Sequence, residues 1–202
     1  MANKLRGKLP DLHRIIQLQS FLHEFHSIER VIHFSATSDR RETDTEHSYT
    51  LSIIAWYVSQ YFPELDTNLC IRLALVHDLV EIYAGDTFTF GDQMMIDSKA
   101  DREKEALLKL EKVWPDFNEL TEDIHNYEDL KTPESNFVYV LDKIVPIIVI
   151  YLGEGRTWKE FNITLDDLKN NKKYKVLKSP QAAHYFDALV ELLKDKPELF
   201  PK

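Results

Sequence analysis

The chain has 202 residues, 44% of them hydrophobic, which is enough for one globular domain with a full core and no disulfide support. Its formal net charge of −9 argues against a general nucleic-acid binder, because such proteins need a basic face to displace counterions from phosphates. A small phosphorylated substrate remains compatible with this charge, since a divalent cation and a few arginines can reverse the field inside one pocket.

The small number of glycine and proline residues predicts a single domain over residues 1–202. Only five glycines and eight prolines occur, with no low-complexity tract or linker. The single cysteine, Cys70, can form no intramolecular disulfide, which favours a reducing, cytoplasmic location. The basic N-terminus leads into no apolar signal core, and the longest apolar run, residues 144–152, is too short to span a bilayer. We therefore expect no membrane partner.

Hydrophobic residues recur every three or four positions, which predicts an all-α fold. Candidate stop and start signals include Pro63 after the second helix, Asp66 or Thr67 before the third and Gly85 after it. Residues 157–179 give the least clear pattern. The expected helices cover, in chain order, about residues 11–28, 45–62, 67–84, 98–113, 117–127, 133–152 and 180–194.

Three fragments place metal-binding side chains among apolar neighbours: Glu46-His47-Ser48, His77-Asp78 and Leu141-Asp142-Lys143. A buried carboxylate is costly unless it is paired or bound to a cation, so Asp78 and Asp142 both need a partner. The sequence offers no convincing arginine beside either residue. Imidazole nitrogens and carboxylate oxygens together suit manganese, cobalt, iron, zinc or nickel more than calcium. The fragments therefore favour one bound divalent metal ion.

Two further acidic residues follow the His-Asp pair. Glu81 is four residues after His77, so a continuous helix would place both on one face. A carboxylate near a metal but outside its ligands can take a proton from water whose pKa the metal has lowered. Asp86, directly after Gly85, could cap a turn or meet the substrate.

Each fragment alone has an ordinary structural explanation. A His-Asp dipeptide occurs by chance in many chains, His47 could bond to solvent at a helix start, and Asp142 could pair with an arginine from another helix. The whole order His…His-Asp-x-x-Glu-x-x-x-Gly-Asp…Asp, spread over three predicted helices with apolar flanks, points instead to a metal-dependent hydrolytic site.

This pattern resembles the HD superfamily and, in detail, its 5′-deoxynucleotidase branch. The resemblance covers about residues 30–145 and implies a single-domain HD-type helical bundle, with C-terminal helices over 157–196 packing on that metal-binding core. It is carried by Glu46-His47-Ser48, His77-Asp78-Leu-Val-Glu81-Ile-Tyr-Ala-Gly85-Asp86, Glu103-Lys-Glu-Ala106, Tyr127-Glu128 and Thr132-Pro-Glu followed by Phe137-Val-x-x-Leu-Asp142-Lys143.

The resemblance also implies roles for the matching residues. Glu81 would handle the nucleophilic water and Asp86 would face the sugar. One divalent ion would be held by His47, His77, Asp78 and Asp142.

Phosphate and nucleoside binding in that family use an arginine and a tryptophan upstream of the first ligand. Here Arg30 and Arg40 are available, and Arg40 keeps the expected distance from His47, but His33 stands where the tryptophan belongs. Lys143 is a third candidate to neutralise the phosphate.

The expected activity is hydrolysis of a deoxynucleoside 5′-monophosphate to nucleoside and phosphate. Alternatives are attack on a triphosphate or another phosphorylated nucleoside, and a non-catalytic HD module that binds a partner. A homodimer is expected from the resemblance and from the apolar face of the last helix, Phe186, Leu189, Val190 and Leu193.

Overall fold

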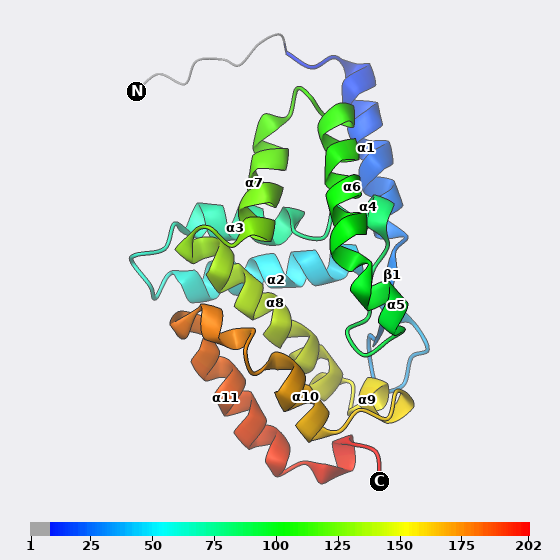
Figure 1. Ribbon diagram of the computed structural model, residues 1–202, viewed down its shortest axis with the longest axis vertical. Coiled ribbons are helices and arrows are strands. Elements are labelled where there is room, and N and C mark those ends of the chain that lie inside the picture. The colour runs from blue at the N-terminus through cyan, green and yellow to red at the C-terminus, as the bar shows by residue number, and fades with distance from the viewer. Residues whose placement is uncertain (1–8) are drawn as a thin grey trace.

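Helices make up almost all the regular structure in the computed structural model, which describes residues 9–202 (Figure 1). The all-α prediction is confirmed, with one two-stranded antiparallel sheet as the exception within those residues. In chain order the elements are α1 (Leu12–His26), β1 (Glu29–His33), β2 (Arg41–Thr43), α2 (Asp44–Ser59), α3 (Thr67–Val76), α4 (Glu81–Ala84), α5 (Gln93–Asp97), α6 (Lys99–Val113), α7 (Asn118–Asp129), α8 (Pro133–Leu152), α9 (Arg156–Glu160), α10 (Leu165–Lys172), η1 (Val176–Lys178), α11 (Pro180–Lys194) and η2 (Pro197–Leu199).

Side-chain caps fix where the two long central helices begin. At α2, the Thr43 hydroxyl accepts the Glu46 backbone N–H while the Glu46 carboxylate accepts the Thr43 backbone N–H. The same reciprocal cap joins Thr132 and Ser135 at α8, which carries proline in its first turn. These caps set the register in which α2 and α8 present their polar side chains.

Helix α8 runs through the centre of the bundle and lies against α2, α3, α7 and α11. By length and composition it is long and apolar enough to cross a membrane, but 56% of its apolar window is buried inside the protein. Asp142 and Lys143 stand in its middle, and its apolar residues dominate the larger hydrophobic cluster. This is the arrangement of a core helix.

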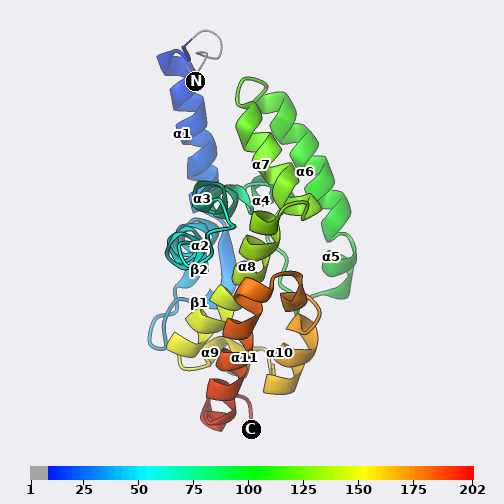
Figure 2. The ribbon, with the colours of Figure 1, turned by 90° about the vertical axis from the view of Figure 1, so that its left-hand side faces the viewer.

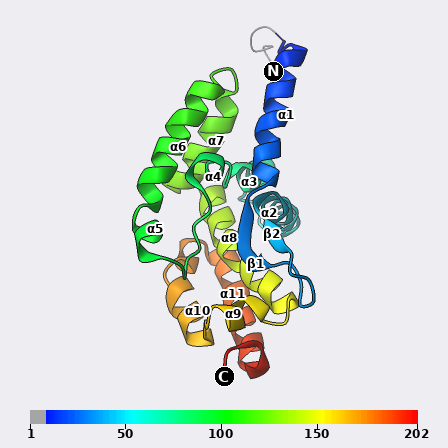
Figure 3. The same ribbon diagram turned by 90° about the vertical axis from the view of Figure 1, so that its right-hand side faces the viewer.

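A second hydrophobic cluster joins α1, α4, α6 and α7, with Leu110 and Ile124 at its centre. Figures 2 and 3 show α6 and α7 at one end of the molecule and α9, α10 and α11 at the other, with α2 and α3 crossing between them. In the C-terminal part of the chain, α11 and η1 both contact α8.

The helix expected over residues 67–84 is two helices, so the prediction of one continuous helix was wrong. Helix α3 ends at Val76 and α4 begins at Glu81, and an i to i−3 hydrogen bond from Glu81 N–H to the Asp78 carbonyl (2.9 Å) marks the turn between them. Successive residues of an α-helix point about 100° apart. In a continuous helix the adjacent side chains of His77 and Asp78 would diverge. The turn after α3 allows both side chains to point toward the same neighbouring residues.

Within residues 9–202, five other α-helices and strands lie in segments for which the sequence predicts no helix or strand. The strands pair Glu29 with Thr43 and His33 with Arg41, directly before α2. Helix α5 lies in the expected loop after Gly85, and α9 and α10 occupy the unclear segment 157–179. None of them is longer than eight residues, whereas helical periodicity is read over windows of 11–18 residues.

Gly155, the N-cap residue just before α9, has a φ of +70°, and a Cβ there would overlap the backbone carbonyl of Leu199 in η2. We expect Gly155→Ala to lower the free energy of unfolding by about 2–4 kcal/mol, through both the left-handed backbone and this overlap. Urea denaturation measures the change. Gly153→Ala is the control, because its φ is −82° and its nearest Cβ contact would be 3.4 Å. Equal losses in both variants would contradict the packing argument.

Candidate metal centre

Four donor atoms from three segments converge between α2, α3 and α8. His47 Nε2 lies 3.0 Å from Asp142 Oδ1 and 3.9 Å from Asp78 Oδ2. His77 Nε2 lies 3.0 Å from Asp78 Oδ2 and 3.7 Å from Asp142 Oδ1. Two atoms bound to one ion at about 2.1 Å, with angles of about 90–110°, lie about 3.0–3.4 Å apart. The two 3.0 Å distances match this range, and the other two are longer. Donor atoms of His47, His77 and Asp78 all lie within 4.8 Å of one another, a spacing compatible with one divalent ion.

The His77 ring is oriented for a cation. Its Nδ1 lies 2.9 Å from the Ala74 carbonyl, to which it donates, and this leaves the lone pair on Nε2. Nε2 is buried and has no hydrogen-bond partner within residues 9–202, although Asp78 Oδ2 lies only 3.0 Å away. A buried ring nitrogen beside a carboxylate without hydrogen-bond geometry fits two ligands of one ion. This observation supports the metal-site interpretation.

The pKa values of the two histidines are shifted in opposite directions. Burial, together with Arg30, lowers the pKa of His47 to about 4, so its imidazole is neutral and able to bind a metal. Burial also acts to lower the pKa of His77, but Asp78 and Asp142 outweigh it and raise the value to about 10. A cation at this point would take the place of the His77 proton.

One oxygen of Asp142 is held by neighbours, and the other faces the histidines. Tyr127 Oη donates to Asp142 Oδ2 at 3.0 Å, and the Lys143 ammonium contacts the same oxygen. Burial acts to raise the pKa of Asp142, but Lys143 and His47 hold it well below its usual range. The carboxylate is therefore ionised, with Oδ1 directed at the ring nitrogens.

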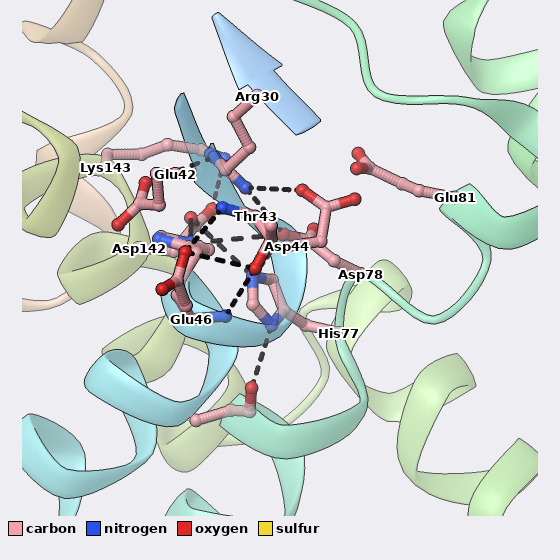
Figure 4. Close-up of polar contacts among 12 residues, drawn as sticks. Arg30, Glu42, Thr43, Asp44, Glu46, His77, Asp78, Glu81, Asp142 and Lys143 are labelled. Carbon is pink, nitrogen blue, oxygen red and sulfur yellow. Dashed lines mark hydrogen bonds and ion pairs between the residues drawn. The ribbon is translucent and has the colours of Figure 1, made fainter. Parts of the chain in front are cut away.

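Arg30 is the cation that the sequence did not place beside the buried acids. From β1 its guanidinium reaches Asp78 at 3.0 Å and Asp44 at 3.3 Å (Figure 4). Its Nε lies 3.5 Å from Glu42. Burial raises the pKa of Glu42 to about 7, and burial with Asp78 does the same for Asp44. Arg30 thus offsets only part of the negative charge buried here.

Glu81 lies next to this cluster as the first residue of α4, and its carboxylate comes within 4.8 Å of those of Asp44 and Asp78. Its Oε1 is 3.4 Å from Lys99 Nζ, and its Oε2 has no hydrogen-bond partner within residues 9–202. Burial, followed by Asp78 and Asp44, raises the pKa of Glu81 well above its usual value. A carboxylate with a raised pKa can accept a proton at neutral pH.

Two connected clefts open beside the donor atoms and share Arg30, Asp86, Asp142 and Lys143 in their walls. The polar cleft also contains Asp78, Glu81, Lys99 and Lys175. The cavity volume of the aromatic cleft is about 90 Å³. Its apolar wall consists of Phe88, Phe90, Pro146, Ile147, Ile150, Trp158, Ile163 and Leu168.

Two of the predicted substrate-binding residues lie elsewhere. Arg40 forms an ion pair with Glu46 at 2.7 Å and lies over the Phe34 ring at 3.8 Å. His33 Nε2 is 2.6 Å from Glu160 Oε2. The described walls of the two clefts include neither side chain, whereas Arg30, Asp86 and Lys143 line both.

Sequence reasoning missed several residues of the site. Glu42 lies in β2 and Asp44 is the first residue of α2, and neither belongs to the fragments that the sequence analysis singled out. Trp158 and Lys172 line the aromatic cleft from the segment whose pattern was unclear, and no motif marks them. Trp158 stacks on Phe200 with ring centroids 4.8 Å apart, which fixes its position.

The fold and the site together define a class: an all-α protein with a buried histidine–carboxylate cluster suited to one divalent cation. The HD domain family matches residues 22–183, so the chain belongs to the HD domain family. The family resemblance predicted from the sequence is confirmed.

Curated relatives and a solved structure agree with this assignment. The human protein named 5′-deoxynucleotidase HDDC2 is 32% identical over 111 residues, 54% of this chain and 53% of that protein. The fission yeast protein named 5′-deoxynucleotidase hdd1 is 26% identical over 124 residues, 58% of this chain and 61% of its own. The chain thus spans about half the length of these curated relatives. A structure titled predicted metal-dependent phosphohydrolase, from Magnetospirillum magnetotacticum, is 27% identical with a TM-score of 0.77 and covers 96% of this chain and 100% of its own.

Removal of one donor should abolish metal binding. We expect His77→Ala to lower the affinity for Mn²⁺ more than about 100-fold, because losing even a supporting partner of a ligand costs about 10–100-fold. Metal analysis after dialysis measures the retained ion. The control is His125→Ala, which removes an exposed histidine paired with Glu111. An unchanged metal content in His77→Ala would exclude this site.

Proposed function

We propose that this protein is a metal-dependent phosphomonoester hydrolase that acts on deoxynucleoside 5′-monophosphates. The observation that carries the proposal is the buried Nε2 of His77, which has no hydrogen-bond partner within residues 9–202. It lies 3.0 Å from Asp78 and 3.7 Å from Asp142, and both carboxylates line a cleft together with Glu81. The names of the human and yeast relatives support the substrate class.

The proposal assigns one divalent ion to His47, His77, Asp78 and Asp142. The nitrogen and oxygen ligand set suits manganese, cobalt, iron, zinc or nickel. When bound, such an ion would polarise a phosphoryl oxygen and lower the pKa of nearby water.

The chain's own residues supply the remaining functions. Glu81 would accept the proton of the attacking water, and Lys99 at 3.4 Å would orient its carboxylate. Arg30 and Lys143 line both clefts and would neutralise charge on the phosphate. Asp86, where the clefts meet, would accept a hydrogen bond from a sugar hydroxyl. The base would stack in the aromatic cleft against Phe88, Phe90 or Trp158.

A second substrate class is a nucleotide with a longer phosphate chain. It is favoured by Lys172 and Lys175, which line the clefts beyond the donor atoms. A non-catalytic module has less support, because His47, His77 and Asp78 lie close together, Asp142 is next to both histidines and Glu81 is next to Asp78. The deciding experiment is a phosphate-release screen over ribonucleotides and deoxynucleotides, as mono- and triphosphates, with several divalent metals.

Glu81→Gln should separate proton transfer from coordination. An amide keeps the shape and hydrogen-bonding capacity of the side chain but cannot take a proton from water. We expect kcat to fall by roughly 10²–10⁴-fold while the metal content stays unchanged. Asp78→Ala, as the comparison, should lose the metal itself. Full activity in Glu81→Gln would remove Glu81 from the mechanism.

A homodimer remains part of the proposal, on different evidence from that in the sequence. Phe186, Val190 and Leu193 of α11 are buried within the monomer, so the apolar face of the last helix does not itself require a partner. Helix α2 instead exposes apolar side chains at i, i+4, i+7 and i+8, a single helical face. These are Tyr49, Ile53, Trp56 and Tyr57.

We expect light scattering to give a dimer mass at micromolar concentration and Trp56→Glu to halve it, because a charge on a self-complementary face opposes its own copy. A wild-type monomer would refute this arrangement. The cytoplasmic location and the absence of nucleic-acid or membrane partners stay predictions from composition.

A further inference from the structure

Three lysines converge where the two clefts meet, on the side formed by α8, α10 and the turn before η1. Lys143 lines both clefts, Lys172 lines the aromatic cleft and Lys175 lines the polar one. We call these three residues the lysine rim. Among the acidic residues of the polar cleft, Asp78 and Asp86 lie in the turns after α3 and α4, and Glu81 lies in α4.

Lys172 is buried without a counterion. Its exposed fraction is 8%, and its ammonium makes no hydrogen bond or ion pair within residues 9–202. Burial, followed by Lys143 and Lys175, lowers its pKa to about 7, while Asp142 acts in the opposite direction. Because Lys172 lines the aromatic cleft and its ammonium has no carboxylate partner in the described part of the chain, the ammonium can donate to an anion bound there.

The other two rim residues leave the positive charge largely uncompensated. Lys175 Nζ donates to the neutral Asn171 side chain at 3.2 Å. Lys143 contacts one carboxylate, that of Asp142, which is itself assigned to the metal. Lys99, which also lines the polar cleft, differs from the three rim lysines because it forms ion pairs with both Glu81 and Glu103. The lysine rim is therefore a local positive site in a chain of net charge −9.

We propose that the lysine rim is a phosphate-binding subsite in which the Lys172 ammonium donates to phosphoryl oxygens. This inference rests on the proposed function for the identity of the ligand as a nucleotide. A tetrahedral dianion suits the rim, because several ammonium groups can each donate to a different oxygen. The dianion has two possible sources: the phosphate at the metal centre, or a further phosphate of a longer chain.

The first experiment uses inorganic sulfate, a doubly charged tetrahedral anion near neutral pH, titrated calorimetrically into the Mn²⁺-loaded protein at pH 6.5. Lys172→Met keeps the length of the side chain and removes its charge. We expect the sulfate affinity to fall about tenfold or more. We also expect the melting temperature to stay or rise, because a buried charge is removed. Lys173→Met, an exposed neighbour on the same segment, should change neither quantity.

The pair of readouts distinguishes binding from a structural role. A lower melting temperature with unchanged sulfate affinity would overturn the subsite. If Lys172→Met does not fold, Lys175→Met tests the polar edge of the rim, and unchanged sulfate affinity there would overturn it equally. Sulfate binding needs no turnover. A protein that binds sulfate through Lys172 but hydrolyses no nucleotide would thus retain the subsite and lose the proposed function.

The second experiment identifies the source of the phosphate by measuring KM for a deoxynucleoside monophosphate and its triphosphate. A rise of about tenfold for both substrates in Lys172→Met assigns the rim to the phosphate at the metal centre. A rise confined to the triphosphate assigns it to a further phosphate. An unchanged KM for both, alongside turnover, would overturn the proposal.

Discussion

Carboxylates buried together at the centre of the bundle are the constraint on which the rest of the structure depends. Asp44, Asp78, Glu81 and Asp142 lie within one small region, and like charges in a medium of low polarity cannot all ionise without cations. Arg30 supplies one positive charge from β1. The raised pKa values of Asp44 and Glu81 show that this is not enough. A divalent cation beside His47 and His77 is the natural complement.

Several local features follow from this constraint. The short hairpin β1–β2 brings Arg30 to the acids and leads directly into the cap of α2. The break between α3 and α4 lets His77 and Asp78 meet the same neighbours. In α8, the most apolar helix, Asp142 is tolerated because Tyr127 and Lys143 hold one of its oxygens. These three features all lie at the polar centre.

The sequence predicted long elements and motif residues better than tertiary partners. Helix α8 was expected over residues 133–152 and the last helix over 180–194, because many apolar repeats and a leading proline mark both. Arg40 was chosen for its distance from His47 along the chain, but it pairs with Glu46. The spacing of residues along the chain does not reveal which carboxylate captures an arginine. The hairpin and α9–α10 were missed because segments of eight residues or fewer are shorter than the window over which a period is recognised.

Chemistry and selectivity are encoded differently in this chain. The donor residues and Glu81 lie in fragments that can be recognised in the sequence, because only a few residue types can bind a metal ion. The cleft walls depend on Trp158 and Lys172, which α9 and α10 bring to the centre only after the C-terminal segment packs on α8. Nothing about hydrolysis requires those two residue types. Differences in substrate among proteins with the same donor set should therefore arise in these C-terminal elements, where packing rather than a motif decides which side chain faces the substrate.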